Sequence, residues 1–303
     1  MVDLPVVRRG NADDSYAVMA ITEYAMTELS RQWGVVAPSE PFPDKTALDA
    51  TWERTRQLYD FLSANADEWW VAEQYGRVVA FARSILCDGV RELTELFAHP
   101  QVQGTGLGRQ LLSKAFPTEG ARHRTIMSTI DPAAQMLYMG SGVFPRFPIR
   151  GFSRVPETVR IESDLLFTPA ADDQPAVDSI GAIDAAVLGF RRSKVHRWLL
   201  ATRGGFLCYR GDEVVGYGYV GRTGGPFAAL ERSDLPAILA HAESSASEQG
   251  LSSFYVLVPL INEAAVGYVT RRRYEMDRIV LELMIDEPFG CFDCYVAGSP
   301  FFL

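Results

Sequence analysis

The sequence is poor in the residues that most often carry metal and redox chemistry. It contains four cysteines and four histidines in 303 residues, which are too few and too scattered for a disulfide framework. Cys291 and Cys294 form an isolated C-x-x-C pair, and a zinc site would need a second pair or nearby histidines. We therefore expect no metal centre, and the role of this pair stays open.

Long apolar runs and an excess of positive charge are also missing. No run approaches the roughly 18 apolar residues of a membrane-spanning helix, and Met1–Gly10 has charge but lacks the apolar core of a signal peptide. The formal net charge of −9 disfavours a nucleic-acid partner, which would select a basic face. These features predict a cytoplasmic protein with no membrane or nucleic-acid partner.

Several catalytic motifs do not occur. Without G-x-S-x-G or H-E-x-x-H, a hydrolase has no support. The glycine-rich stretch Gln103–Arg109, which reads QGTGLGR, lacks the Lys-Ser or Lys-Thr that completes a P-loop. Its G-x-G-x-G spacing also differs from the G-x-G-x-x-G dinucleotide fingerprint, which lies near the start of a βαβ unit.

This glycine-rich stretch nevertheless has the features of an anion-binding loop. An apolar run precedes it and stops at Pro100, and Leu111–Phe116 follows it with helical character. Glycine allows positive φ and a close approach of the main chain to a ligand. Free N–H groups at a helix start favour a bound phosphate. The stretch therefore predicts a strand, a glycine-rich turn and a helix start that binds phosphate.

The rest of the first half predicts strands and helices in a definite order around this loop, β-α-α-β-β-β-α-β-α-β. The predicted elements are a strand at Val6–Arg9, a helix from Asn11 to about Trp33, a helix at Thr46–Ala64, strands at Trp69–Glu73, Val78–Ile85, Arg91–Ala98 and His123–Ile130, a helix from Pro132 and a β region from Val143.

Loop and element order together resemble the GNAT N-acetyltransferase superfamily. Gln103, Gly106 and Gly108 fill the [QR]-x-x-G-x-[GA] pattern of that family's acyl-CoA pyrophosphate loop. Leu137–Phe144 is similar to its L-Y-x-x-x-G-F landmark, with one extra residue before the aromatic. The resemblance covers about residues 4 to 158. It implies a mixed α/β fold with a mostly antiparallel twisted sheet flanked by helices.

The resemblance also implies acetyl-CoA as the co-substrate and assigns residues to it. The main chain around Phe97 and Ala98 would hold the pantetheine arm as an added strand. Gln135 stands where many relatives carry a cofactor-contacting Asn. Main-chain N–H groups would hold the pyrophosphate at Gln103, Gly104, Thr105, Gly106, Leu107, Gly108 and Arg109.

Three residues are candidates for proton transfer. The resemblance implies that Tyr138 protonates the departing thiolate, and the alternative is a tyrosine packed under the cofactor. Glu92 has the spacing before Ala98 at which histone-type relatives carry their base. Glu95 lies on the same strand, facing the other way if the strand is regular, and a bulge would change that parity. A water relay is the remaining alternative.

The second half repeats the first with an offset near 130 residues. Phe97-Ala98 matches Phe227-Ala228, and Tyr138 falls on Tyr268. The glycine loop has no counterpart, because Glu231–Pro236 reads ERSDLP. We therefore expect two GNAT-like domains, at 1–158 and 159–303, with one acyl-CoA site in the first.

The function predicted from the sequence is transfer of an acyl group, most often acetyl, to the amine of a small molecule. The alternative is a non-catalytic protein that binds or senses CoA, or serves as a scaffold. Mycothiol synthase, another tandem GNAT enzyme of similar length, keeps its working loop in the second half, where this sequence has none. The sequence leaves the identity of the amine, the acyl chain length and the oligomeric state open.

Overall fold

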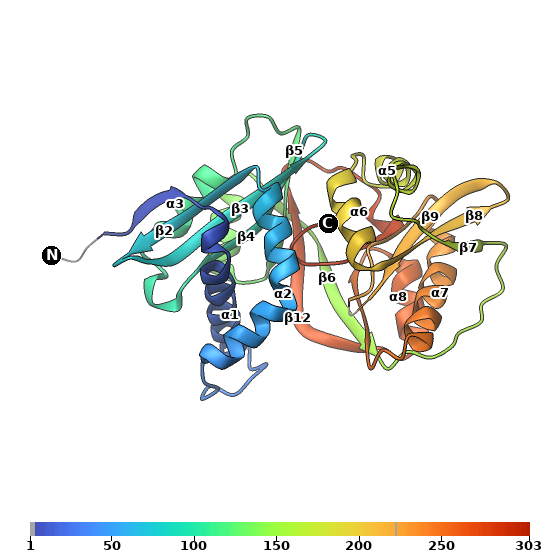
Figure 1. The fold of residues 1–303 in the computed structure, drawn as a ribbon, viewed down its shortest axis with the longest axis horizontal. Coiled ribbons are helices and arrows are strands. Elements are labelled where there is room, and N and C mark those ends of the chain that lie inside the picture. The colour runs from blue at the N-terminus through green and yellow to red at the C-terminus, as the bar shows by residue number, and fades with distance from the viewer. Residues whose placement is uncertain (1–3, 222) are drawn as a thin grey trace. The chain divides into compact units, whose positions relative to one another are not determined.

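The computed structural model describes residues 4–221 and 223–303 (Figure 1). The first three residues of the N-terminal segment considered above lie outside this part. Contacts divide the chain into two compact units. Unit 1 contains Met1–Ile126 with Met136–Gly142, and unit 2 contains Met127–Gln135 with Val143–Leu303.

The first half follows the predicted order of elements, with boundaries shifted by a few residues at most. Its elements are β1 (Val6–Arg9), η1 (Ala12–Asp14), α1 (Ser15–Gln32), α2 (Lys45–Asn65), β2 (Glu68–Gln74), β3 (Arg77–Cys87), β4 (Val90–Ala98), η2 (Pro100–Val102), α3 (Leu107–Ala115), β5 (His123–Thr129), α4 (Pro132–Met139) and β6 (Phe144–Arg154).

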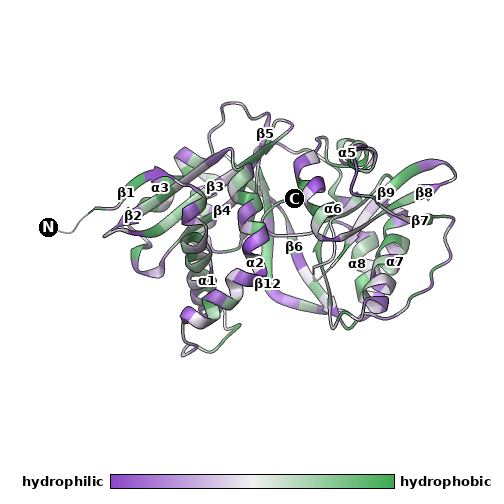
Figure 2. Cartoon of the chain, viewed as in Figure 1, coloured by the Kyte–Doolittle hydropathy of each residue, from purple (hydrophilic) through white to green (hydrophobic). Residues whose placement is uncertain are grey.

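Local signals explain several of these boundaries. The Asn11 side chain accepts from the Asp13 N–H and starts η1 in a capping box. Asp44 accepts from the Ala47 N–H at the start of α2. Hydrophilic residues recur along α2, whose buried positions include Leu48 and Leu62 (Figure 2). Helix α2 is therefore amphipathic, with one face toward the core.

In unit 1 the strand order is β1-β2-β3-β4-β5, antiparallel except for the parallel pair β4–β5. Trp69 and Phe81 belong to the core under α1 and α2. Trp70 faces the other way and contacts Lys114 of α3, with the ammonium 4.3 Å from the ring centroid. The two faces of the sheet are thus covered by different helices.

The second half repeats this order. Its elements are β7 (Leu166–Pro169), α5 (Gln174–Val187), α6 (Ser193–Thr202), β8 (Gly204–Arg210), β9 (Glu213–Val220), β10 (Phe227–Ala229), η3 (Arg232–Asp234), α7 (Leu235–Glu248), β11 (Phe254–Pro259), α8 (Glu263–Arg271) and β12 (Glu275–Ile285), followed by η4 (Phe292–Cys294) and β13 (Tyr295–Val296).

Strand β6 is exchanged between the two repeats. It closes the first repeat in sequence, but within unit 2 it pairs antiparallel with β11 on one side and β12 on the other. Contacts therefore assign β6 to unit 2, although the repeat boundary predicted at 158/159 falls after it. That boundary stays a prediction about the repeat.

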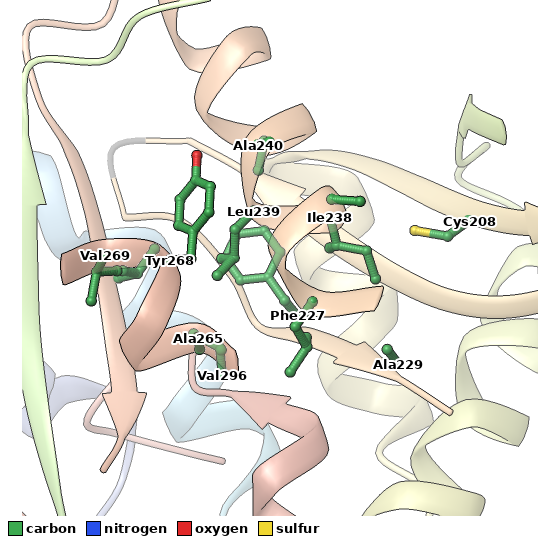
Figure 3. Packing of buried hydrophobic residues seen from close by; sticks show 14 of the residues in the cluster. Cys208, Phe227, Ala229, Ile238, Leu239, Ala240, Ala265, Tyr268, Val269 and Val296 are labelled. Carbon is green, nitrogen blue, oxygen red and sulfur yellow. The ribbon is translucent and has the colours of Figure 1, made fainter. Parts of the chain in front are cut away.

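The core of unit 2 is built from aliphatic and aromatic side chains. Phe227, Ile238, Leu239 and Val269 are buried together in a cluster that joins β10 to α7 and α8 (Figure 3).

A second buried group surrounds the carboxylate of Asp184, which accepts from Arg192 and Tyr217 and lies 2.6 Å from His196 Nε2. All four side chains are buried, so His196 belongs to an internal hydrogen-bond network of unit 2.

Candidate functional site

The glycine-rich stretch forms the turn between η2 and α3. Gly104 and Gly106 have φ of +76° and +88°, and a Cβ at either position would meet no atom within 4 Å. Glycine is needed here for backbone conformation, because L side chains resist positive φ. Gly106 is the N-cap of α3 and provides no side-chain cap. The first N–H groups of α3 are thus left for a ligand.

Side chains brace this turn from its outer ends. Gln103 Nε2 donates to the carbonyl oxygen of Ala98 at 3.1 Å, and Thr105 Oγ1 donates to that of Val102 at 2.7 Å. The ring of His99 accepts from the Gln101 N–H at 3.3 Å, and burial lowers the pKa of this histidine. The exposed Arg109 adds a positive charge at the same helix end.

Strand β4 continues beyond the last residue at which it pairs with its parallel neighbour β5. The pairing with β5 ends at Leu93 and Ile126, while β4 continues to Ala98 and stays paired with β3. Phe97 lies against Phe81, with ring centroids 6.0 Å apart. Beyond Leu93 the main chain of β4 on its β5 side pairs with no strand of the described residues. An extended ligand can pair with such an edge.

A bulge at Thr94 decides which way the two candidate glutamates face. Glu92 pairs with Ile85 and Glu95 with Arg83, and the register shifts between them. Since Ile85 and Arg83 are two residues apart on β3, they share a face of the sheet, and so do Glu92 and Glu95. A regular strand would have separated them.

Glu95 is held in a buried ion pair. Its carboxylate accepts from Arg83 Nε at 2.8 Å and also from Nη2, and neither side chain is exposed to solvent. Burial raises the pKa of Glu95, and the Arg83 charge and hydrogen bond only partly offset this. The Arg83 guanidinium lies 4.8 Å from the Trp69 ring centroid. Glu95 is thus engaged inside unit 1.

Glu92 lies three residues before Glu95 on β4 and is also buried, with 8% of its surface exposed. In the parallel register it stands opposite Thr125 of β5, whose Oγ1 is buried and has no hydrogen-bond partner among the described residues. Glu92 therefore lies at the last paired positions of β4 and β5, next to the point where the two strands separate.

Tyr138 lies on α4, and its neighbour on that helix contacts the glycine turn. A Cβ at Gly108 would lie 3.4 Å from Leu137 Cδ2. The structure thus brings the start of α3 and the end of α4 together. Tyr138 is buried, with 6% of its surface exposed. Gln135, on the first turns of the same helix, donates to the Glu282 carboxylate, and its predicted contact with the cofactor stays a prediction.

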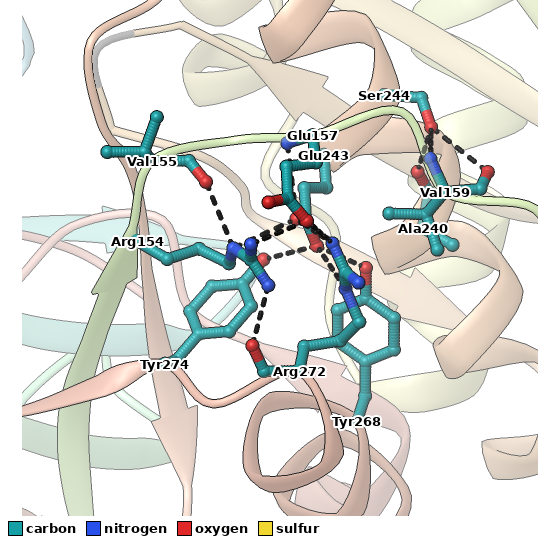
Figure 4. Close-up of polar contacts among 10 residues, drawn as sticks. All are labelled: Arg154, Val155, Glu157, Val159, Ala240, Glu243, Ser244, Tyr268, Arg272 and Tyr274. Atoms are coloured by element: carbon teal, nitrogen blue, oxygen red, sulfur yellow. Dashed lines mark hydrogen bonds and ion pairs between the residues drawn. The ribbon is translucent and has the colours of Figure 1, made fainter.

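The corresponding positions in the second half are engaged differently. In place of the glycine turn, η3 leads into α7, and the Asp234 carboxylate accepts from Arg210 at 2.7 Å. Tyr268, the counterpart of Tyr138, donates to Glu243 at 2.6 Å (Figure 4). Glu243 also accepts from Tyr274 and Arg272. The second half therefore shows an acidic helix start and an internally bonded tyrosine.

A cavity of about 910 Å³ lies in unit 1, between α1 and the β2–β3 turn, and reaches η2. Tyr16, Tyr24 and His99 line it. Trp69 and Trp70 do not line it, because Trp69 is buried in the core and Trp70 lies under Lys114.

Two residues near the opening between β4 and β5 were not found from the sequence. Thr94 forms the bulge, and its Oγ1 donates to the Arg83 carbonyl oxygen at 3.0 Å. Arg83 sits within a strand that reads as apolar on both faces. The one signal for it was the arginine itself, an unusual residue in a strand that is otherwise buried.

One family model and a set of solved structures match the chain. Residues 65–142 match the family described as the Acetyltransferase (GNAT) domain. A putative acetyltransferase from Pyrococcus horikoshii has a TM-score of 0.71 at 13% identity, covering 99% of this chain and 96% of that one. A GCN5-related N-acetyltransferase from Sphaerobacter thermophilus has a TM-score of 0.60 at 13% identity, covering 94% and 96%.

A tandem GNAT protein from the clavulanic acid biosynthesis pathway matches with a TM-score of 0.53 at 12% identity, covering 94% of this chain and 99% of that one. At such identities the likeness shows the fold. The predicted resemblance and the predicted mixed α/β fold are confirmed. No curated protein sequence matches the chain. Among the helices of the described residues, none has the length and apolar character to cross a membrane.

Proposed function

Residues 65–142 match the GNAT acetyltransferase domain, and on that premise we propose that the chain is an acyl-CoA-dependent N-acyltransferase. In this proposal it transfers an acetyl group from acetyl-CoA to a primary amine of a small molecule. The observation that carries the proposal is the open glycine turn at the start of α3, soon after a strand whose pairing with its parallel neighbour ends at Leu93. The proposal includes a cytoplasmic location for this reaction.

Unit 1 offers separate groups for the two ends of the co-substrate. The N–H groups at Gly106–Arg109 favour the pyrophosphate, and Arg109 adds a full positive charge. The open side of β4 from Thr94 to Ala98 offers main-chain donors and acceptors to the pantetheine amides. Gln135 is engaged by Glu282, so we propose that it supports α4 without contacting CoA.

The reaction needs two proton transfers at the reacting atoms. The amine nitrogen attacks the thioester carbon, the C–S bond breaks, and an amide and a free thiol result. We propose that Glu92 accepts the proton that the amine gives up, directly or through a water. Tyr138 donates a proton to the departing sulfur, and solvent returns that proton to the phenol. A main-chain N–H at the Thr94 bulge stabilises the oxyanion.

Glu95 has a different place in this scheme. Its carboxylate is buried and hydrogen-bonded to Arg83, so it has no path to a proton on an external amine. We propose that Glu92, on the same face of the strand, is the base of the pair.

The proposal is tested by calorimetry with acetyl-CoA up to millimolar concentration, followed by thiol release across a panel of primary amines. Binding with amine-dependent thiol release is expected. A protein that binds no acetyl-CoA would contradict the proposed site. Binding without turnover on any amine would favour the CoA-sensing alternative.

A further inference from the structure

We propose that Arg83 is a positioning residue that fixes the bulge at Thr94, and with it the main-chain groups that face the thioester. This inference rests on the proposed function, because the thioester is the ligand that those groups would serve. It assigns a role to a buried ion pair that proton transfer does not use.

Two bonds tie both sides of the bulge to this one residue. Thr94, the extra residue of the bulge, donates from Oγ1 to the Arg83 carbonyl oxygen at 3.0 Å. Glu95, the next residue, accepts from Arg83 Nε at 2.8 Å through its carboxylate. The Arg83 main chain therefore holds the bulged residue, while its side chain holds the residue that resumes the pairing.

The bulge also decides which main-chain groups are open to a ligand. Along a strand, successive N–H groups point alternately to the two neighbouring strands. One extra residue reverses this alternation for everything after it. From Glu95 to Ala98, the bulge thus selects which N–H groups bond to β3 and which face the side where β5 no longer pairs. A slip by one residue would turn the other set toward the ligand.

The chemistry of the pair fits a geometric role better than a stabilising one. Both side chains have 0% exposure. The free energy needed to remove two charges from water can exceed the free energy gained from their attraction. Arg83 Nη1 and Glu95 Oε1 have no hydrogen-bond partner among the described residues. Apolar side chains of similar volume would fill this space at least as well. What they would not do is attach Glu95 to a single position on β3.

The surroundings leave the guanidinium little freedom. It lies over the ring of Trp69 with its Cζ 4.8 Å from the centroid, and 5.7 Å from that of Tyr59. Tyr59 and Trp69 are themselves buried in the core with α1. Aromatic rings from β2 and α2 thereby hold the Arg83 side chain in place while it bonds to Glu95 of β4. A rigid support of this kind is what an oxyanion donor requires, since small displacements weaken it strongly.

The test distinguishes an effect of the ion pair on the bulge from an effect on overall stability. Arg83→Met alone would leave the Glu95 carboxylate buried and unpaired, so the informative variant is Arg83→Met with Glu95→Leu, which removes both charges. We expect this double variant to fold and to lose less in acetyl-CoA affinity than in kcat, because the glycine turn that would hold the pyrophosphate is untouched while the main-chain groups of Thr94–Ala98 shift. We expect kcat to fall by roughly 100-fold, the size of the loss for one oxyanion donor.

Three further single variants complete the test. Thr94→Val should lower kcat and Thr94→Ser should restore it, since serine keeps the hydroxyl that bonds to the Arg83 carbonyl oxygen. Arg91→Met removes a different buried arginine, which lies on β4 and bonds to Asp67 and to the Pro117 carbonyl oxygen. It should reduce stability and leave kcat unchanged. An unchanged kcat in the double variant would overturn the proposal.

A crystal structure of the double variant distinguishes failure of this inference from failure of the proposed function. If the parent neither binds nor turns over acetyl-CoA, the proposed function fails, but the bulge remains observable. The inference predicts that the β3–β4 register beyond Leu93 changes or becomes heterogeneous in the double variant. A register identical to that of the parent would overturn the inference, whatever the activity.

Discussion

The phenol of Tyr268 donates a 2.6 Å hydrogen bond to the carboxylate of Glu243. Glu243 is fully buried and also receives hydrogen bonds from Tyr274 and Arg272. In this half of the chain the tyrosine of the repeated motif thus belongs to a hydrogen-bond network around the ion pair of Glu243 and Arg272. Its counterpart in the first half, Tyr138, lies on the helix whose Leu137 side chain faces Gly108 at the start of α3.

This pair of tyrosines provides a matched comparison within one chain. Tyr138→Phe should lower kcat by roughly 100-fold or more, because the departing thiolate loses its proton donor. Tyr268→Phe should leave kcat unchanged and reduce stability, since Glu243 loses one donor. Steady-state rates of thiol release and thermal melts measure both effects. Equal kcat in Tyr138→Phe and the parent would show that the phenol is not the acid.

Glu243→Gln should destabilise the protein by about 2 kcal/mol, because a buried charged acceptor of several hydrogen bonds becomes a neutral amide. Burial raises the pKa of Glu243, but bonds from Arg272, Tyr268 and Tyr274 outweigh it and bring the pKa below the ordinary 4.5. The stabilisation is therefore complete above about pH 4.5 and lost as the pH falls through the lower folded value. Urea unfolding between neutral and acidic pH should show a smaller loss in the variant than in the parent.

Gly106→Ala should weaken acetyl-CoA binding by at least tenfold, because φ of +88° is strained for alanine and the turn must reorganise. Gly211→Ala is the matched control. Gly211 has φ of +60° and equally open surroundings, but lies in the turn between β8 and β9. Both variants should lose a similar amount of stability, about 1 kcal/mol. Calorimetry should find weaker binding in the first variant, and a loss in the second as well would refute a specific role for Gly106.

Glu92→Gln should lower kcat/KM by roughly 100-fold near neutral pH. A lysine-like amine has a pKa near 10.4, so more of it is already deprotonated as the pH rises, and the loss should shrink toward about pH 10. Rates from about pH 6 to 10 test this. Glu73→Gln, on β2 and paired with Arg8, is the control and should show no such profile. A parent-like profile in Glu92→Gln would favour a base-free water relay.

Much of the fold was accessible from local patterns. The hairpin of β2 and β3, the capped starts of η1 and α2, and the glycine turn before α3 all follow from short-range signals. The repeat was also visible, because Phe97-Ala98 and Phe227-Ala228 both fall where a strand leads toward a helix. The exchange of β6 was not, since pairing with β11 and β12 depends on contacts more than a hundred residues away.

By itself the sequence determined the loop, the order of elements around it and the absence of glycines at Glu231–Pro236, because positive φ and helix starts depend on neighbouring residues. The tertiary structure alone decided the facing of Glu92 and Glu95. Strand parity after Thr94 depends on the register with β3, and that register is held by Arg83, eleven residues away from Thr94. Both glutamates are buried, but Glu95 is bonded to Arg83, while Glu92 lies at the point where β4 and β5 separate.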